Sequence, residues 1–219
     1  MSAVLKIDFV SDVACPWCAV GLASLQQALA NCQPEVRAHL HFQPFELNPD
    51  MGPEGEDLNE HLARKYGSTP QQRAQIQATI AERGAALGFT FSPTGRGRIV
   101  NTFNAHRLLH WVGQQGEAAQ LALKRALLQA YHGRGERVDH DAVLLAAVRQ
   151  AGLDEAEAAR VLAAGEHAQA VRDAERQWLD AGIQSVPAVV INDRHLISGG
   201  QPPEVFERAL RQIAGAAAG

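Results

Sequence analysis

The alternation of apolar and polar positions predicts two strands near the N-terminus with a helix between them. Residues 4–10 are rich in β-branched side chains but are interrupted by Lys6 and Asp8, a pattern typical of an edge or half-buried strand. Residues 36–42 alternate with period two and predict a second strand. The intervening apolar residues recur at helical spacing, so we expect a helix from about residue 15 to about residue 30: Leu22, Leu25 and Leu29.

Helical periodicity dominates the middle of the chain. A connection rich in proline, glycine and acidic residues, residues 48–57, leads into it. Apolar residues then recur at intervals of three and four in six segments, several of them separated by glycine-containing breaks: 58–66, 70–87, 101–112, 117–131, 139–151 and 154–163.

Strand signals return near the C-terminus, after one more helix at residues 167–181. Two short runs, residues 188–191 and 195–198, flank a two-residue turn, and an amphipathic helix at residues 203–213 follows. The order is thus β-α-β, a block of helices, and α-β-β-α. We therefore expect an α/β domain built from residues 1–54 and 166–219, with an all-helical insertion at residues 55–165.

Composition narrows the class of protein. A chain of 219 residues buries enough surface to fold without disulfides. The net charge of −4, with acids and bases mixed, gives no electrostatic reason to expect nucleic acid or a membrane surface as partner. We see neither a secretory signal nor an apolar run long enough to span a bilayer, so we expect a cytoplasmic protein. Three cysteines do not form a disulfide scaffold and are expected to be catalytic, metal-bound or incidental.

Two of the cysteines, Cys15 and Cys18, lie three residues apart at the predicted start of the first helix. Residues at this spacing are neighbours on one helix face, close enough for a small adjustment to form a disulfide. The unpaired N–H groups of a helix N-terminus also favour a thiolate, which is the nucleophilic form. We therefore expect Cys15 to attack a substrate and Cys18, one turn further in, to resolve the mixed disulfide.

A metal-binding or purely incidental role for this cysteine pair is also conceivable. A structural zinc site requires four ligands, and the chain has no second Cys-x-x-Cys, so no metal site is predicted. The pair could also be incidental. The third cysteine, Cys32, is about 20 Å from Cys18 along the helix axis and is expected to be a buried or incidental thiol.

A second signal is the sequence Ser185-Val186-Pro187 directly before a predicted strand. Proline commonly begins a strand, and it can also form a cis peptide bond. The residues alone leave both possibilities open.

A Cys-x-x-Cys on the first helix and a Val-Pro before a late strand together resemble the thioredoxin superfamily, and the insertion resembles its DsbA branch. The likeness extends from Val4 to about Ile213. Five segments are more narrowly similar to FrnE-type members, which are cytoplasmic DsbA-like proteins often described as dithiol–disulfide isomerases: Asp8–Asp12, Cys15–Cys18, Phe45–Pro49, Asn101–Phe103 with Ala105–Arg107, and Ile197–Gln201.

The resemblance implies roles for further residues. Pro187 would be cis and pack beside Cys15, and Val186 would present its backbone to a bound peptide. A helix of the insertion would turn three side chains toward the active-site groove: Asn101, Phe103 and His106. From the residues alone, Phe103 is better explained as core and His106 as a partly buried histidine.

The dipeptide between the cysteines, Pro16-Trp17, differs from that of the secreted DsbA oxidants, and this difference bears on mechanism. The secreted DsbA oxidants carry a histidine there, whereas this dipeptide has no cation, so we predict a less oxidising site. We expect Trp17 to offer an exposed apolar surface to a client chain or a small thiol.

Two basic glycine loops, Thr94–Arg98 and Gly133–Gly135, lack a phosphate-binding context and are expected to be solvated turns.

These observations predict a thiol–disulfide oxidoreductase or isomerase that acts on protein or small-molecule thiols. No bound cofactor is implied, and glutathione or a thioredoxin system is the expected redox partner. One alternative is the glutathione-using branch of the fold, the kappa transferases and hydroxychromene carboxylate isomerases, which carry serine in place of the first cysteine. Another is a chaperone-like binding module without enzymatic activity.

Overall fold

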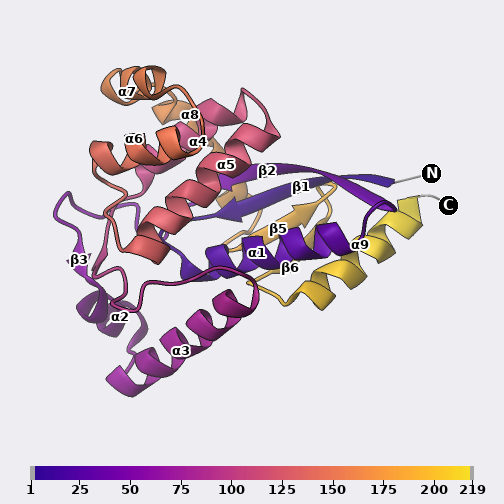
Figure 1. Ribbon diagram of the computed structural model, residues 1–219, viewed down its shortest axis with the longest axis horizontal. Helices are drawn as coiled ribbons and strands as arrows, with labels where there is room; N and C mark the ends of the chain where they lie inside the picture. The colour runs from indigo at the N-terminus through magenta and orange to yellow at the C-terminus, as the bar shows by residue number, and fades with distance from the viewer. Residues whose placement is uncertain (1–2, 218–219) are drawn as a thin grey trace.

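A four-stranded mixed sheet forms the centre of the protein, in the order β2-β1-β5-β6. The computed structural model describes residues 3–217 (Figure 1). Its strands are β1 (Ala3–Ser11), β2 (Val36–Pro44), β5 (Ala188–Ile191) and β6 (His195–Ser198). Strand β1 pairs in parallel with β2 and antiparallel with β5, and β5 pairs antiparallel with β6. The predicted thioredoxin-like α/β architecture with a helical insertion is confirmed.

Strand β1 is internal, so of the two expectations, an edge strand or a half-buried strand, the edge strand was wrong. Its polar residues interrupt the apolar pattern but find partners within the sheet. The buried carboxylate of Asp8 lies 3.2 Å from Lys6 Nζ and accepts a hydrogen bond of 2.7 Å from the Gln43 side chain. Because Asp8 forms an ion pair with Lys6 and accepts a hydrogen bond from Gln43, a strand with two charged residues can occupy the middle of a sheet.

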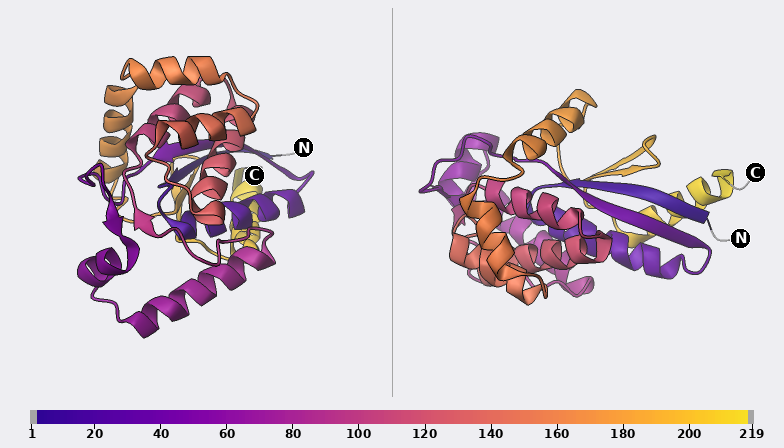
Figure 2. Two further views of the ribbon diagram at one scale, coloured as in Figure 1. Left: turned by 60° about the vertical axis from the view of Figure 1, so that its left-hand side comes forward. Right: turned by 90° about the horizontal axis from the view of Figure 1, so that it is seen from above.

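Helices cover the two faces of the sheet. Helices α1 (Pro16–Asn31) and α9 (Pro203–Ala217) pack on one face, where the side chains of Leu5, Ile7 and Phe9 meet them in the main core. Helix α8 (Ala168–Asp180) lies on the opposite face (Figure 2). There, Trp178 joins Val10 in a smaller core. Alternate residues of β1 thus serve the two cores, as the period of a strand requires.

The insertion between β2 and α8 carries the remaining helices: α2 (Leu58–Tyr66), α3 (Pro70–Ala86), α4 (Phe103–Gly113), α5 (Glu117–Leu128), α6 (Asp141–Gln150) and α7 (Glu155–Ala163). A π-helical turn, η1 (Gln129–Gly133), continues α5. Two strands of two residues each, β3 (Glu56–Asp57) and β4 (Arg98–Ile99), pair antiparallel. The sequence did not predict them, since two residues carry no periodic signal.

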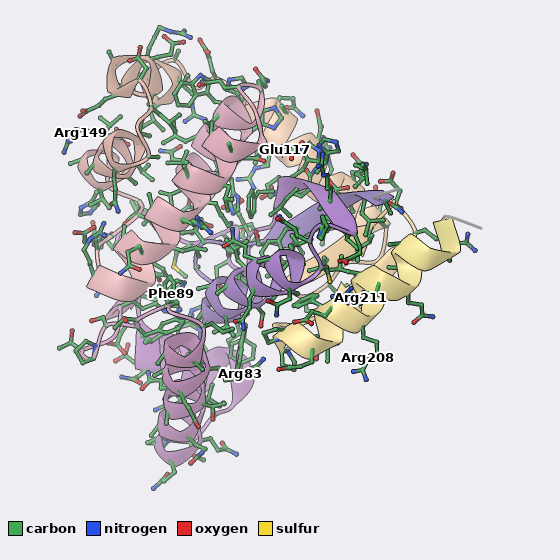
Figure 3. All side chains as sticks on the ribbon, turned by 45° about the vertical axis from the view of Figure 1, so that its right-hand side comes forward. Arg83, Phe89, Glu117, Arg149, Arg208 and Arg211 are labelled. Atoms are coloured by element: carbon green, nitrogen blue, oxygen red, sulfur yellow. The ribbon has the colours of Figure 1, made fainter. Side chains whose placement is uncertain are left out.

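Side chains of α5 attach the insertion to the edge of β2. Glu117, labelled in Figure 3, accepts a hydrogen bond of 3.1 Å from the Leu40 N–H. The Gln120 amide accepts one of 3.0 Å from the Phe42 N–H and donates one of 3.1 Å to the Phe42 carbonyl. These bonds occupy backbone groups that an edge strand would otherwise leave unpaired.

The core of the insertion reaches the start of α1. Val13 and Ala14 are buried in it with residues of α4, α5, α6 and α7. The insertion therefore positions the residues that directly precede Cys15. Among residues 3–217, the structure contains no helix of the length and apolarity that crossing a membrane requires.

Candidate active site at the start of helix α1

The two cysteines occupy different positions at the N-terminus of α1. Cys15 is the N-cap residue, Pro16 begins the helix, and the Cys18 N–H donates a hydrogen bond of 3.1 Å to the Cys15 carbonyl. Proline suits this place because the first N–H groups of a helix lack partners within it. Both thiols are reduced; Cys15 is 4 % exposed and Cys18 is fully buried. Only Cys15 therefore offers an attacking sulfur near the surface.

Cys15 contacts the loop that precedes β5. Its Sγ donates a hydrogen bond of 3.5 Å to the Val186 carbonyl, and the Val186–Pro187 peptide bond is cis, as the resemblance implies. Two glycines permit the close approach to α1 of this loop and of the turn that follows β6. A Cβ on Gly21 would lie 3.0 Å from Pro187 Cγ, and one on Gly200 would lie 3.0 Å from the Trp17 carbonyl oxygen.

The surroundings give the two thiols opposite acidities. A hydrogen bond from Cys18 lowers the pKa of Cys15 below its usual value and outweighs the opposing effect of burial. Burial raises the pKa of Cys18 well above its usual value, and the neighbouring Cys15 raises it further. Of the two thiols, Cys15 is therefore the one that ionises first, beside a Cys18 that keeps its proton, which is the asymmetry that thiol–disulfide exchange requires.

A buried carboxylate lies behind the cysteines. Asp12 accepts hydrogen bonds from the Ala14 N–H at 3.0 Å, the Leu47 N–H at 2.8 Å and the Thr102 hydroxyl at 2.8 Å. His106 Nε2 lies 3.5 Å from its Oδ1 atom. Burial favours the neutral acid, yet the pKa of Asp12 lies below its usual value because His106 and the backbone amides outweigh that effect. Asp12 thus fixes the turn before Cys15 as a carboxylate.

Lys124 of α5 is a buried cation that the sequence analysis missed. It is fully buried, its Nζ atom has no hydrogen-bond partner within the described chain, and burial lowers its pKa. The charges that act on it are those of Cys18, Asp12 and Cys15. A signal existed, since Gln120, Leu123, Lys124 and Leu127 are the buried stripe of α5, and Lys124 falls on it at helical spacing.

The remaining predicted site residues lie in different surroundings. Trp17 is half-buried rather than exposed, because the Arg83 guanidinium lies 5.2 Å from its ring centroid and Gly200 packs against it. Arg83 projects from α3 (Figure 3) and also donates to the Gly200 carbonyl. Pro16 is half-buried beside Trp17. These contacts cover much of the surface that Trp17 was expected to offer.

Asn101 and Phe103 serve the start of α4. Asn101 precedes the helix instead of lying on it, and its side-chain oxygen accepts a hydrogen bond of 2.9 Å from the Phe103 N–H. The Phe103 ring lies 3.8 Å from the guanidinium carbon of Arg172. His106 is 2 % exposed and turns toward Asp12. The structure thus brings Cys15, Cys18, Val186 and Pro187 together, and gives Asn101 and His106 contacts within the fold.

A second buried charge cluster lies near β2. The Glu46 carboxylate pairs with Arg172 of α8, which also pairs with Glu175 at 2.9 Å. Burial and the proximity of Glu175 raise the pKa of Glu46 to about 7. One oxygen of the Glu46 carboxylate and one of the Glu175 carboxylate are buried without a hydrogen-bond partner among the described residues. Glu46 is therefore the carboxyl group of this cluster whose pKa lies near neutral pH. Among the described residues, no group of three or more potential ligands is arranged to hold a metal ion.

Comparison with known proteins identifies the family. A family model described as a DSBA-like thioredoxin domain matches residues 6–211. The chain belongs to the DsbA-like thioredoxin family. The structure is similar to that of a probable DsbA oxidoreductase of Streptomyces coelicolor, with a TM-score of 0.87 and 31 % identity over 96 % of this chain and 90 % of that one.

Two more distant relatives of this DsbA-like protein cover nearly its whole length. An uncharacterized protein of Bacillus subtilis, YwbO, is 24 % identical over 94 % of this chain and 96 % of its own. A 2-hydroxychromene-2-carboxylate isomerase shares the fold, with a TM-score of 0.73 and 13 % identity over 97 % of this chain and 98 % of its own. At that identity the likeness to the isomerase shows the fold alone.

Proposed function

We propose that this protein is a dithiol–disulfide oxidoreductase in which Cys15 and Cys18 are the redox pair. The observation that carries the proposal is the asymmetry of the pair: the pKa of Cys15 is lowered at a helix N-terminus, and that of Cys18 is raised by burial one turn away. The proposed membership in the FrnE-type subgroup rests on the five sequence segments that resemble it.

In the proposed reduction, the Cys15 thiolate attacks one sulfur of a substrate disulfide. A Cys15–substrate bond forms, the substrate S–S bond breaks, and the second substrate sulfur leaves as a thiolate. Cys18 then loses its proton and attacks Cys15 Sγ. The Cys15–Cys18 disulfide forms and the first substrate sulfur leaves, so two electrons pass from the enzyme to the substrate. Oxidation of a substrate dithiol follows the same steps in reverse. Isomerisation requires Cys15 to leave before Cys18 attacks.

The proposed substrates are protein or small-molecule thiols and disulfides, with glutathione or a thioredoxin system as redox partner in the cytoplasm. The low exposure of Cys15 requires the substrate sulfur to approach the tip of α1 closely. Val186 lies beside that tip and supports β-type pairing with a bound chain.

A trapping experiment tests this function. In a Cys18→Ala, Cys32→Ser variant, Cys15 should accumulate a mixed disulfide with an oxidised test peptide or with glutathione, detected as a mass increase. In the matched Cys32→Ser protein the adduct should be transient, because Cys18 resolves it. Stable adducts in both proteins would contradict resolution by Cys18 and favour a glutathione-handling role. If neither protein reacted with the disulfide, the assignment of Cys15 and Cys18 as the redox pair would be refuted.

A further inference from the structure

The two basic glycine loops pack against each other near the start of α1. The expectation that they are solvated turns holds for the exposed Arg134 but was wrong for Arg96, which is half-buried and bonded within the fold. A Cβ on Gly135 would lie 2.9 Å from the Gly95 carbonyl oxygen, and Gly135 has a φ of +70°. The Ser92 N–H donates a hydrogen bond of 2.8 Å to the His132 carbonyl. The first loop is therefore held against η1, close to the start of α1.

His132 and Arg96 bind the two carbonyl groups that directly precede Cys15. His132 Nε2 lies 2.8 Å from the Val13 carbonyl oxygen, and a carbonyl only accepts, so Nε2 carries the proton. Burial lowers the pKa of His132 well below its usual value, which leaves Nδ1 as an acceptor. Arg96 Nη1 lies 3.3 Å from this Nδ1 and donates a bond of 2.9 Å to the Ala14 carbonyl.

The charge of Arg96 is not neutralised by these partners. A carbonyl oxygen and a neutral imidazole nitrogen are both uncharged, and the guanidinium carbon lies 5.4 Å from the centroid of the Tyr131 ring. The Nε atom of Arg96 is buried and has no hydrogen-bond partner in the described chain. A half-buried guanidinium with a spare donor stabilises a neighbouring anion, and Arg96 is bonded to the carbonyl of Ala14, the residue directly before Cys15, which becomes an anion in exchange.

We propose that Arg96 is a positioning residue of the redox site: it anchors the Ala14 carbonyl and places beside Cys15 the positive charge that the Pro16-Trp17 dipeptide lacks. The proposal rests on the proposed function and adds how the insertion tunes it. Because a cation stabilises the thiolate of the reduced enzyme, Arg96 makes the pair more oxidising than the dipeptide alone predicts.

Other groups around Cys15 also act on its charge, and their effects must be separated from that of Arg96. Asp12 opposes the thiolate, while the Cys18 hydrogen bonds favour it. The titratable and charged groups that face Cys15 from the elements packed against it are Asp12, Cys18, Tyr66 of α2, Arg96, Lys124 of α5 and, through Arg96, His132. A substitution of Arg96 leaves all the others in place.

The test compares Arg96→Gln with Arg134→Gln, which changes the exposed arginine of the companion Gly-Arg-Gly loop. Both are made in a Cys32→Ser background, and folding is checked by circular dichroism. The rate of alkylation of Cys15 by iodoacetamide is followed from pH 5 to 10, with the modified residue identified by mass spectrometry. We expect Arg96→Gln to move the midpoint of this profile to higher pH and to slow alkylation at pH 7 at least about threefold. Arg134→Gln should match the parent.

Two further measurements separate charge from structure. In glutathione buffers, Arg96→Gln should shift the equilibrium toward the Cys15–Cys18 disulfide, and a tenfold shift corresponds to a potential about 30 mV more negative. Arg96→Lys retains the positive charge and should keep the pH midpoint near that of the parent, and it carries the test if Arg96→Gln fails to fold. A folded Arg96→Gln with unchanged profile and potential, or a lysine variant whose midpoint moves as far as that of glutamine, would overturn the proposal. The alkylation profile requires no exchange activity, so failure here is distinct from failure of the proposed function.

Discussion

The Cys15 thiol and the Val186 carbonyl lie 3.5 Å apart, sulfur to oxygen, and join the start of α1 to the loop before β5. A thiolate has no proton to donate. Ionisation of Cys15 therefore breaks this bond and leaves the carbonyl oxygen free to accept from a substrate N–H. The same event that activates the nucleophile thus prepares the proposed backbone contact with a bound chain.

The close contact between Gly21 and Pro187 predicts that alanine at position 21 disturbs the site. The added Cβ would lie 3.0 Å from Pro187 Cγ and 3.3 Å from the Gly200 Cα, so the loop must shift. We expect Gly21→Ala to lower the free energy of unfolding by about 1–3 kcal/mol. It should also slow disulfide exchange by moving Val186 away from Cys15. Urea denaturation and reduction of a fluorescent disulfide peptide measure the two effects.

The control for this substitution is Gly215→Ala on α9, where an added Cβ would meet no atom within 4 Å. Alanine at this helical position should leave exchange unchanged and should not lower stability. Equal losses in the two variants would show that the contact between Gly21 and Pro187 has no special importance.

The buried Lys124 predicts a gain in stability when its amine is removed. Because burial lowers its pKa, the folded state binds the lysine proton more weakly than the unfolded state does. The free energy of unfolding therefore rises with pH up to the ordinary lysine value of 10.5. Lys124→Met keeps the side-chain bulk, and we expect it to raise the free energy of unfolding by about 1–3 kcal/mol at pH 7, less at pH 10. A loss of stability at pH 7 would instead show that the cation compensates Asp12.

The Glu46 carboxyl predicts a pH-dependent difference between the parent and Glu46→Gln. Its folded pKa of about 7 exceeds the ordinary 4.5, so its contribution to stability is present below pH 4.5 and is lost as the pH rises through 7. Glutamine does not ionise. Urea denaturation should therefore show Glu46→Gln gaining stability relative to the parent between pH 5 and pH 8. Glu60→Gln, on an exposed face of α2, is the control and should show a constant offset. A constant offset for Glu46→Gln as well would contradict the raised pKa of Glu46 beside Glu175.

Periodicity predicted the order of the main strands and the position of each helix. It worked because each long element buries one face, as in α2, whose observed bounds match the predicted residues 58–66. It failed where an element is too short to show a period, or where its position in the sheet depends on contacts with distant parts of the chain. The two residues of β3 carry no pattern, and the internal place of β1 depends on partners that lie elsewhere in the chain, Gln43 for Asp8 and Asp193 for Lys6.

The candidate site divides in the same way. Cys15 and Cys18 could be proposed as the redox pair because their residue type and spacing carry the chemistry, whereas the cis bond at Pro187 was implied only by the family resemblance. Arg96 could not, because a basic residue in a glycine loop is expected to be solvent-exposed until the packing is known. Lys124 falls on the apolar stripe of α5 and was missed because a lysine is rarely buried without a partner. The positions of both side chains depend on how the insertion meets α1.

The most direct test of this account is a thiol titration of the purified protein across glutathione redox buffers, with the cysteines identified by mass spectrometry. We predict a reversible two-electron transition at Cys15 and Cys18, while Cys32, buried at the end of α1, stays reduced. Its midpoint would place the protein among oxidants or reductants. The absence of any transition, or a Cys15–glutathione adduct that Cys18 never resolves, would contradict the assignment of this pair as the redox centre.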